Sequence, residues 1–189
     1  PMCWHNYAIL LIHELRIPEA LNALHTSLRL DPDVASVWCN LSLAKFAERR
    51  IEPARRTLYR AISLEPALSH ATPDQAITFW EQGGKLTADT IDALWDFALI
   101  SLASGDYRNG WRYYEVRFST KNFVSSEVPT VGPRLSSLVD APRPGEPELV
   151  VWSEQGLGDA IQFGRYLPLL DAAGIPYEVR CRKPLLNLF

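Results

Sequence analysis

The feature that most constrains this chain is a spacing of 34 residues that recurs near its N-terminus. Pairs of identical residues at this offset include Trp4/Trp38, Ala20/Ala54, Leu24/Leu58 and Pro32/Pro66. Asn6/Asn40 and Leu30/Leu64 share it too, and Tyr7/Leu41, Ala8/Ser42 and Ser27/Ala61 match more loosely. A fixed period of this length indicates a repeated unit that buries its hydrophobic face only by stacking on its neighbours. The chain is therefore predicted to begin as a repeat protein.

The order of residue types within each unit predicts two antiparallel helices. Small residues such as Ala8 and Ala20 are expected where the helices approach closely, and Trp4 fills the space beside them. Proline ends the unit because it disfavours helical geometry in the residue before it. The expected helices span about 2–14, 18–30, 36–48 and 52–64. This pattern resembles the tetratricopeptide repeat.

A third, degenerate unit is expected further along the chain. Trp95 takes the aromatic position, Leu99 the small position and Gly105-Asp106 the turn between the helices. The second helix is expected over Tyr107–Phe118, with Trp111 in place of the usual alanine. Terminal repeats are often atypical in this way.

An insertion separates the second and third units. Trp95 follows Trp38 by 57 residues rather than 34, so the insertion has 23 residues. A helix start at Thr72-Pro73-Asp74 and a Gly83-Gly84 stop predict one extra helix, over Gln75–Gln82.

The sequence changes character twice beyond the repeats. Residues 119–147 are rich in proline, serine and glycine and lack periodicity, which predicts a linker. The apolar run Leu149–Trp152 then precedes a glycine turn and a segment of helical spacing, and a second strand is expected over Tyr177–Cys181. The expected fold is mainly α: a tetratricopeptide α-solenoid over 1–118, the linker, and an incomplete Rossmann-like β-α-β segment over 148–189.

The tetratricopeptide resemblance implies a protein or peptide partner, because in this family the first helices line a groove that usually binds peptides. The repeats of protein O-linked N-acetylglucosamine transferases carry a row of asparagines at the place held here by Asn6 and Asn40. Amides both donate and accept, so such a row holds an extended peptide backbone regardless of its sequence. The alternative is that Asn6 and Asn40 are merely solvated, and Phe97 interrupts the series.

A second mode of peptide binding in the family is excluded by the residues present. Chaperone-binding members hold a carboxylate with lysines and asparagines on the first helices. None of these stands at the equivalent positions here, which are His5, Ile9, Cys39, Leu43, Asp96 and Ile100.

The turn Gly156-Leu157-Gly158-Asp159 is the candidate site for chemistry. A P-loop is excluded because no lysine follows, and a dinucleotide fingerprint is weak because Ile161 occupies the third glycine position. Asp159 is either a helix N-cap or a base placed at the C-terminal edge of the first strand, where α/β folds bind their ligands.

The block from Glu154 to Leu170 resembles the opening of the acceptor domain in heptosyltransferase-like glycosyltransferases of the B-type fold. Residues 104–118 resemble the segment that closes repeat arrays joined to such domains. The resemblance implies a catalytic base at Asp159 and transfer of a sugar from a nucleotide donor in the full-length protein, without a metal or a cofactor bound to this fragment. It also implies a substrate-binding set: Glu154, Gln155, Gly156, Gly158, Gln162 and Arg165.

The same resemblance implies that the chain is truncated at both ends. The nucleotide sugar is expected to bind a second domain that the chain lacks, so the fragment itself is expected to be inactive. The alternative is a non-enzymatic tetratricopeptide-repeat scaffold.

Composition and charge also limit the kinds of partner and ligand that the chain is expected to bind. The formal net charge of −3 gives no electrostatic case for nucleic acid, and the longest apolar runs are far shorter than a membrane span. Cys3, Cys39 and Cys181 form no CxxC or Cys/His cluster, so neither a disulfide framework nor a zinc site is predicted. A reducing, cytoplasmic location is expected, and the oligomeric state is left open.

Overall fold

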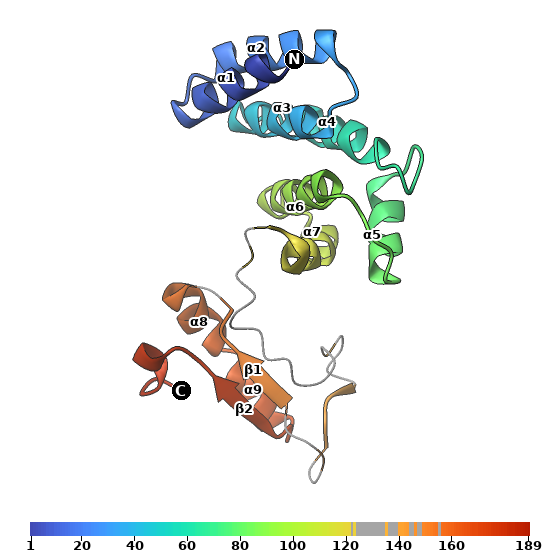
Figure 1. The fold of residues 1–189 in the computed structure, drawn as a ribbon. Helices are drawn as coiled ribbons and strands as arrows, with labels where there is room; N and C mark the ends of the chain where they lie inside the picture. The colour runs from blue at the N-terminus through green and yellow to red at the C-terminus, as the bar shows by residue number, and fades with distance from the viewer. Residues whose placement is uncertain (122, 124–134, 136–139, 144–145, 147–148, 155) are drawn as a thin grey trace. The chain divides into compact units, whose positions relative to one another are not determined.

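The structure is a computed structural model that describes residues 1–121, 123, 135, 140–143, 146, 149–154 and 156–189. It divides into two compact units, Pro1–Phe123 and Val124–Phe189. Unit 1 is helical and unit 2 contains a small parallel sheet (Figure 1). The two units are described separately.

Three helical hairpins form unit 1 in the part of the chain that the structure describes. They pair α1 (Met2–His13) with α2 (Ile17–Leu30), α3 (Ala35–Ala47) with α4 (Ile51–Ser63), and α6 (Ala88–Ala103) with α7 (Tyr107–Tyr114). The four helices predicted from the 34-residue period are confirmed, each boundary lying within one residue of its expected position. Helix α7 ends earlier than predicted, since the chain tightens into a 3-10 helix over Glu115–Ser119.

The same turn joins the two helices of each hairpin. Its middle residue has a left-handed backbone at Leu15 (φ 59°), Arg49 (φ 60°) and Gly105 (φ 86°). The next backbone N–H donates to a carbonyl five residues earlier, as in a Schellman turn: Arg16 to Leu11, Arg50 to Lys45 and Asp106 to Ser101. These three turns are therefore structurally equivalent positions in the three hairpins.

The equivalent turns correct the register of the third hairpin. Arg49 follows Leu15 by 34 residues, and Gly105 follows Arg49 by 56, so the insertion has 22 residues rather than 23. The aromatic position then belongs to Leu94 and the small position to Ala98, and both are fully buried. The predicted positions of Trp95 and Leu99 were wrong by one residue, because the alignment rested on matching one tryptophan to another.

The prediction that Trp111 replaces the alanine of the second helix was also wrong. Gly110 takes the place of Ala20 and Ala54, and all three are buried, whereas Trp111 is 50% exposed. A Cβ atom on Gly110 would lie 2.7 Å from Leu102 Cδ2 and 3.0 Å from the Leu102 backbone nitrogen. The two helices of this hairpin approach too closely for a side chain at this position.

Helix α5 (Pro73–Glu81) is the extra helix predicted within the insertion. A capping box begins it: Gln75 N–H donates to Thr72 Oγ1 at 3.3 Å, and Thr72 N–H donates to Gln75 Oε1 at 2.9 Å. Gly83 (φ 87°) ends it with the turn seen at the ends of the first helices. The helix nevertheless forms no hairpin with α6.

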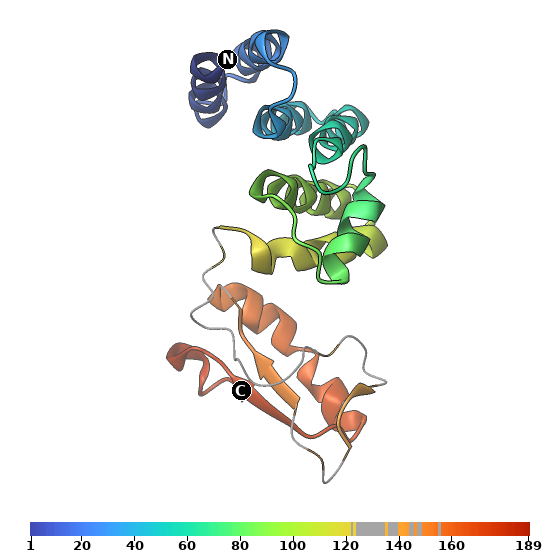
Figure 2. The ribbon, with the colours of Figure 1, turned by 45° about the vertical axis from the view of Figure 1, so that its right-hand side comes forward.

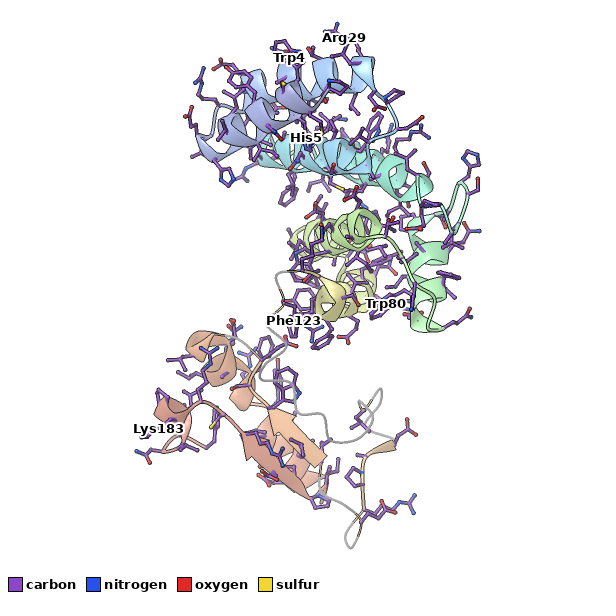
Figure 3. The ribbon with its side chains drawn as sticks, in the orientation of Figure 1. Trp4, His5, Arg29, Trp80, Phe123 and Lys183 are labelled. Atoms are coloured by element: carbon purple, nitrogen blue, oxygen red, sulfur yellow. The ribbon has the colours of Figure 1, made fainter. Side chains whose placement is uncertain are left out.

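Polar contacts attach α5 to the third hairpin instead. Arg112 donates to Glu81 Oε2 at 2.7 Å, and Tyr113 donates its hydroxyl to Asp74 Oδ1 at 2.7 Å. Trp80 of α5 donates its indole N–H to Ser119 Oγ at 3.1 Å (Figure 3). The insertion is thus packed onto α7 and the 3-10 helix that follows it.

Two clusters of buried side chains form the core of unit 1, and Trp38 packs against both. The first cluster joins α1, α2 and α3. The second joins α3 and α4 to α5, α6, α7 and the 3-10 helix. Helix α3 therefore connects the first hairpin to the rest of the unit.

Unit 2 is a β-α-β arrangement in the part that the structure describes. Strand β1 (Leu149–Trp152) pairs in parallel with β2 (Tyr177–Arg180), with Leu149 opposite Tyr177 and Trp152 opposite Arg180. Helices α8 (Leu157–Gly164) and α9 (Leu167–Ala172) lie between the strands in sequence, and a 3-10 helix (Lys183–Leu185) follows β2. The first predicted strand is confirmed, and the second ends one residue early.

Unit 2 buries very little. Leu185 is its one buried residue among those described, and α8 and α9 bury none. Over the described ranges, every helix is too short or too polar to cross a membrane.

Candidate functional site

The first helices α1, α3 and α6 follow one another along one side of unit 1 (Figure 2). The register set by the three turns places Asn6 on α1, Asn40 on α3 and Asp96 on α6 at equivalent positions. The predicted series of polar residues is therefore continued by Asp96 and is not interrupted by Phe97. Phe97 is 2% exposed and packs in the core.

An apolar row accompanies the polar row. Ile9, Leu43 and Leu99 each lie three residues beyond a member of the polar row, so they share its helix face. Leu43 and Leu99 are 36% and 40% exposed. We call the surface formed by both rows the first-helix face, and its members are Asn6, Ile9, Asn40, Leu43, Asp96 and Leu99.

His5 connects the first and second hairpins at this face. Figure 3 labels His5 on α1. Its Nε2 lies 2.7 Å from Asn40 Nδ2, and the side chain is 6% exposed. The contact is a hydrogen bond when the amide donates to an unprotonated Nε2. Burial lowers the pKa of His5, and Asp89 opposes this only in part, so the neutral ring is favoured. The proton then sits on Nδ1, which is buried without a partner among the described residues.

Helix α6 brings a negative charge to its end of the face. Asp89, Asp92 and Asp96 stand at i, i+3 and i+7, a spacing that places them on one side of a helix. Burial, reinforced by Asp92, raises the pKa of Asp96 to about 7. Burial also raises the pKa of Asp92. The charge of Lys121 opposes this rise, and the charge of Asp89 adds to it.

The Cys39 thiol of α3 lies near the three aspartates of α6. Its Sγ lies 3.9 Å from the backbone carbonyl oxygen of Asp89. Burial raises its pKa well above the usual range, and the three aspartates of α6 add to this. The thiol is therefore held in its protonated, unreactive form. This cluster was not predicted from the sequence, although the spacing of the three aspartates is a helical one.

The corrected register also changes the positions compared with the carboxylate-binding members of the family. Trp95 and Leu99 now replace Asp96 and Ile100 in that comparison, and Ile100 is buried in the core. Lysine and asparagine are still absent from these positions.

The glycine turn of unit 2 connects β1 to α8. Gly156 is the N-cap residue of α8, with a φ of 30°, and the cap has no side-chain hydrogen bond. Asp159 lies in the first turn of the helix, so the N-cap alternative for this residue was wrong. The positive φ favours glycine at this position, and the Asp159 carboxylate lies beside it: a Cβ atom on Gly156 would lie 2.8 Å from Asp159 Oδ2. The Asp159 side chain is exposed after the end of β1.

The other predicted site residues that the structure describes form no shared cluster of contacts with Asp159. Gly158 has open space around its Cβ position, and Gln162 is exposed. The Arg165 guanidinium lies 5.0 Å from the centre of the Tyr166 ring and donates to the Tyr166 hydroxyl at 3.1 Å. Within the described ranges, neither Gln162 nor Arg165 forms a hydrogen bond or ion pair with Asp159.

Glu154 is half-buried beside the end of β1. Gln155 lies outside the described residues. The role of the whole set in substrate binding stays a prediction.

A cavity of about 530 Å³ lies elsewhere in unit 2. Its lining includes Ile175, Tyr177, Val179, Cys181 and Phe189, and none of the predicted site residues. Across the described part of the chain, His, Cys, Asp and Glu side chains form no group of three or more that could hold a metal ion.

Comparison with known proteins gives a short, partial similarity. No family model matches the sequence. Over 65 residues the chain is 32% identical to N-alpha-acetyltransferase 16, NatA auxiliary subunit, of Homo sapiens, and equally to the protein of that name from Mus musculus. The match covers 34% of this chain and 8% of each relative, so the chain spans a small part of their length. The described chain is mainly helical, with three helical hairpins that are consistent with a helical repeat and a small two-stranded α/β unit.

Proposed function

We propose that unit 1 is a protein-interaction region that binds an extended peptide segment on the first-helix face. The observation that carries this proposal is the equivalence of Asn6, Asn40 and Asp96, which three identical turns place in register. An extended peptide presents N–H and C=O groups along its whole length, so polar side chains repeated on three packed hairpins can each meet one.

The chemistry of the face supports the same conclusion. Amide side chains both donate and accept, so Asn6 and Asn40 suit the N–H and C=O groups of a peptide of any sequence. The exposed Leu43 and Leu99 add apolar area whose burial contributes about 25 cal/mol per Å². The relatives' name describes an auxiliary subunit, which supports a role in an assembly.

The test begins with selection of peptides from a random displayed library by the purified chain. Fluorescence anisotropy then measures the affinity of a selected peptide for wild type and for Asn6→Ala. A lost backbone hydrogen bond is expected to weaken binding by about fivefold to tenfold. Asn22→Ala is the matched control, because Asn22 is an exposed asparagine on a second helix, and it should bind like wild type. Equal affinity for all three proteins would contradict the proposal.

We further propose, for a longer protein containing unit 2, transfer of a sugar from a nucleotide donor with Asp159 as the base. The supporting observation is an exposed carboxylate that follows β1 in a parallel β-α-β unit, held beside Gly156. Ligands of open parallel sheets bind at the carboxyl ends of the strands, which is where such a base would act.

Nucleotide-sugar hydrolysis by the full-length protein tests this second proposal. Asp159→Asn should lower turnover by at least a hundredfold if the carboxylate removes a proton. Asp140→Asn is the matched control, since Asp140 is an exposed aspartate outside the turn. Unchanged turnover in Asp159→Asn would remove the base assignment. Absence of hydrolysis by wild type, with peptide binding retained, would leave the scaffold alternative.

A further inference from the structure

The third member of the polar row differs chemically from the first two. Asn6 and Asn40 carry amides, which donate and accept, whereas an ionised Asp96 only accepts. A peptide that crosses the first-helix face therefore meets neutral groups on α1 and α3 and an anionic group on α6. Recognition at the α6 end must depend on the charge of the peptide.

Asp96 lacks a partner. Within the described residues its carboxylate accepts no hydrogen bond and forms no ion pair, although the side chain is mostly shielded from solvent. Other aspartates of unit 1 are paired: Asp106 with Asn109 and Arg55, Asp74 with Tyr113, and Asp33 with Arg60. A shielded carboxylate without a donor is costly, and its pKa of about 7 reflects that cost.

The charges around Asp96 do not compensate it. Asp92 and Asp89 on α6 add negative charge, and Cys39 on α3 stays protonated. Burial disfavours a positive charge on His5. Cations of the other packed elements have partners of their own. Arg55 of α4 contacts Asp106 and the Phe97 ring, Lys45 of α3 donates to Thr57, Arg112 of α7 pairs with Glu81, and Arg117 of the 3-10 helix pairs with Glu115. Lys121 acts on Asp92 and is exposed.

His5 adds no group that a peptide on the face would meet. Its side chain is 6% exposed, and its Nδ1 is buried without a partner in the described part of the chain. The group that the face lacks is a cation near Asp96 and Asp92, and a basic side chain of a peptide supplies one.

On the basis of the peptide-binding function, we propose that the first-helix face selects a basic peptide. A lysine or arginine side chain of the peptide pairs with Asp96 and Asp92, while its backbone runs over Asn40 towards Asn6. Helices α3 and α6 pack directly, at about 8–10 Å between axes, and an extended chain advances about 3.3 Å per residue. The basic residue therefore follows or precedes the residue over Asn40 by roughly three positions.

Peptide pools of one design test the proposal. Each pool has a single fixed central residue, lysine, arginine, glutamine or glutamate, within random uncharged flanks. Anisotropy measures binding of each pool to the whole chain at pH 8 and low salt. The lysine and arginine pools should bind at least tenfold more tightly than the glutamine pool, and the glutamate pool should bind most weakly.

Variants then assign the preference to the aspartates. Asp96→Asn combined with Asp92→Asn should remove the preference for lysine and arginine, so that the lysine, arginine and glutamine pools bind the variant equally. Asp33→Asn is the control, because Asp33 pairs with Arg60 away from the face, and it should keep the preference. Thermal unfolding of each variant checks that it is folded.

Two results would overturn the proposal, and they are distinguishable. Equal binding of all pools, or a basic preference that survives in the double variant, would refute the role of the aspartates and leave peptide binding intact. Failure of every pool to bind would refute peptide binding on this face as well.

Discussion

Asp96 is a half-buried carboxylate that has another carboxylate, Asp92, near it. Burial first, and Asp92 second, raise its pKa from 3.8 to about 7. The folded state therefore holds this proton more tightly than the unfolded state between these two pH values. Folding stability should fall as pH rises through that window and become flat above it.

Asp96→Asn removes this penalty. We expect its free energy of unfolding to exceed that of wild type by about 1–3 kcal/mol at pH 8, because the amide carries no charge. The difference should shrink as pH falls through the window and approach zero below about pH 3, where both states of wild type are mostly protonated. Urea unfolding at several pH values measures it, with Asp33→Asn as the exposed control. A difference that does not vary with pH would contradict the assignment.

Glu65 is a buried carboxylate whose pKa is lowered rather than raised, because the effect of burial is outweighed by hydrogen bonds to it. It is 3% exposed and accepts from Thr87 N–H at 2.9 Å, Thr87 Oγ1 at 2.8 Å and Ala67 N–H at 3.1 Å. Burial alone would raise its pKa, but these donors, with Thr90, outweigh it and lower the pKa below 4.5. The carboxylate thereby ties the end of the second hairpin to the start of α6.

Glu65→Ala should cost about 1–3 kcal/mol of stability at pH 7, because it leaves buried donors unpaired. The folded-state pKa is depressed, so this stabilisation is complete above the unfolded pKa and is lost as pH falls through the folded value. The loss relative to wild type should therefore diminish below about pH 4.5. Urea unfolding provides the measurement, and Glu52→Ala on the surface of α4 is the control. A deficit of the same size at pH 3 would argue against the linkage.

At the scale of elements, close packing rather than helix propensity governs α7. Gly110→Ala should destabilise the protein by about 1–3 kcal/mol, because the new methyl group would meet Leu102 at 2.7 Å. Helix propensity alone predicts a gain of about 1 kcal/mol, so the sign of the change separates the two effects. Urea unfolding gives the sign. Gly158→Ala, at a helical glycine with open space, should be neutral or stabilising.

The elements differ in how far their sequence determines them. Helices α1 to α4 follow from the 34-residue period, because each contains its own apolar spacing and a proline follows the second helix of each unit. Helix α5 follows from Thr72, Pro73 and the Gly83 stop, which are local signals. The third hairpin was displaced by one residue because two adjacent residues, Leu94 and Trp95, both suit an aromatic or large apolar position.

At the scale of the whole molecule, the core of unit 1 is self-contained. Among the described residues, both of its buried clusters draw only on the chain up to Val116. Residues 1–123 should therefore fold alone, with the helical circular dichroism signal and the peptide affinity of the whole chain retained. Size-exclusion chromatography and thermal unfolding check the fold. A truncated chain that aggregates or unfolds without cooperativity would show that unit 1 depends on unit 2.

The sequence by itself determined the local structure of this protein: four repeat helices, the extra helix, the first strand and the glycine turn. These elements depend on spacings and capping residues within a few turns of chain. Only the tertiary structure decided that Asp96 continues the row of Asn6 and Asn40, and that its half-buried carboxylate has no partner among the described residues. The physical reason is that register and burial depend on the Gly105 turn, the contact of Gly110 with Leu102 and the packing of α6 on α3, which join residues distant in the sequence.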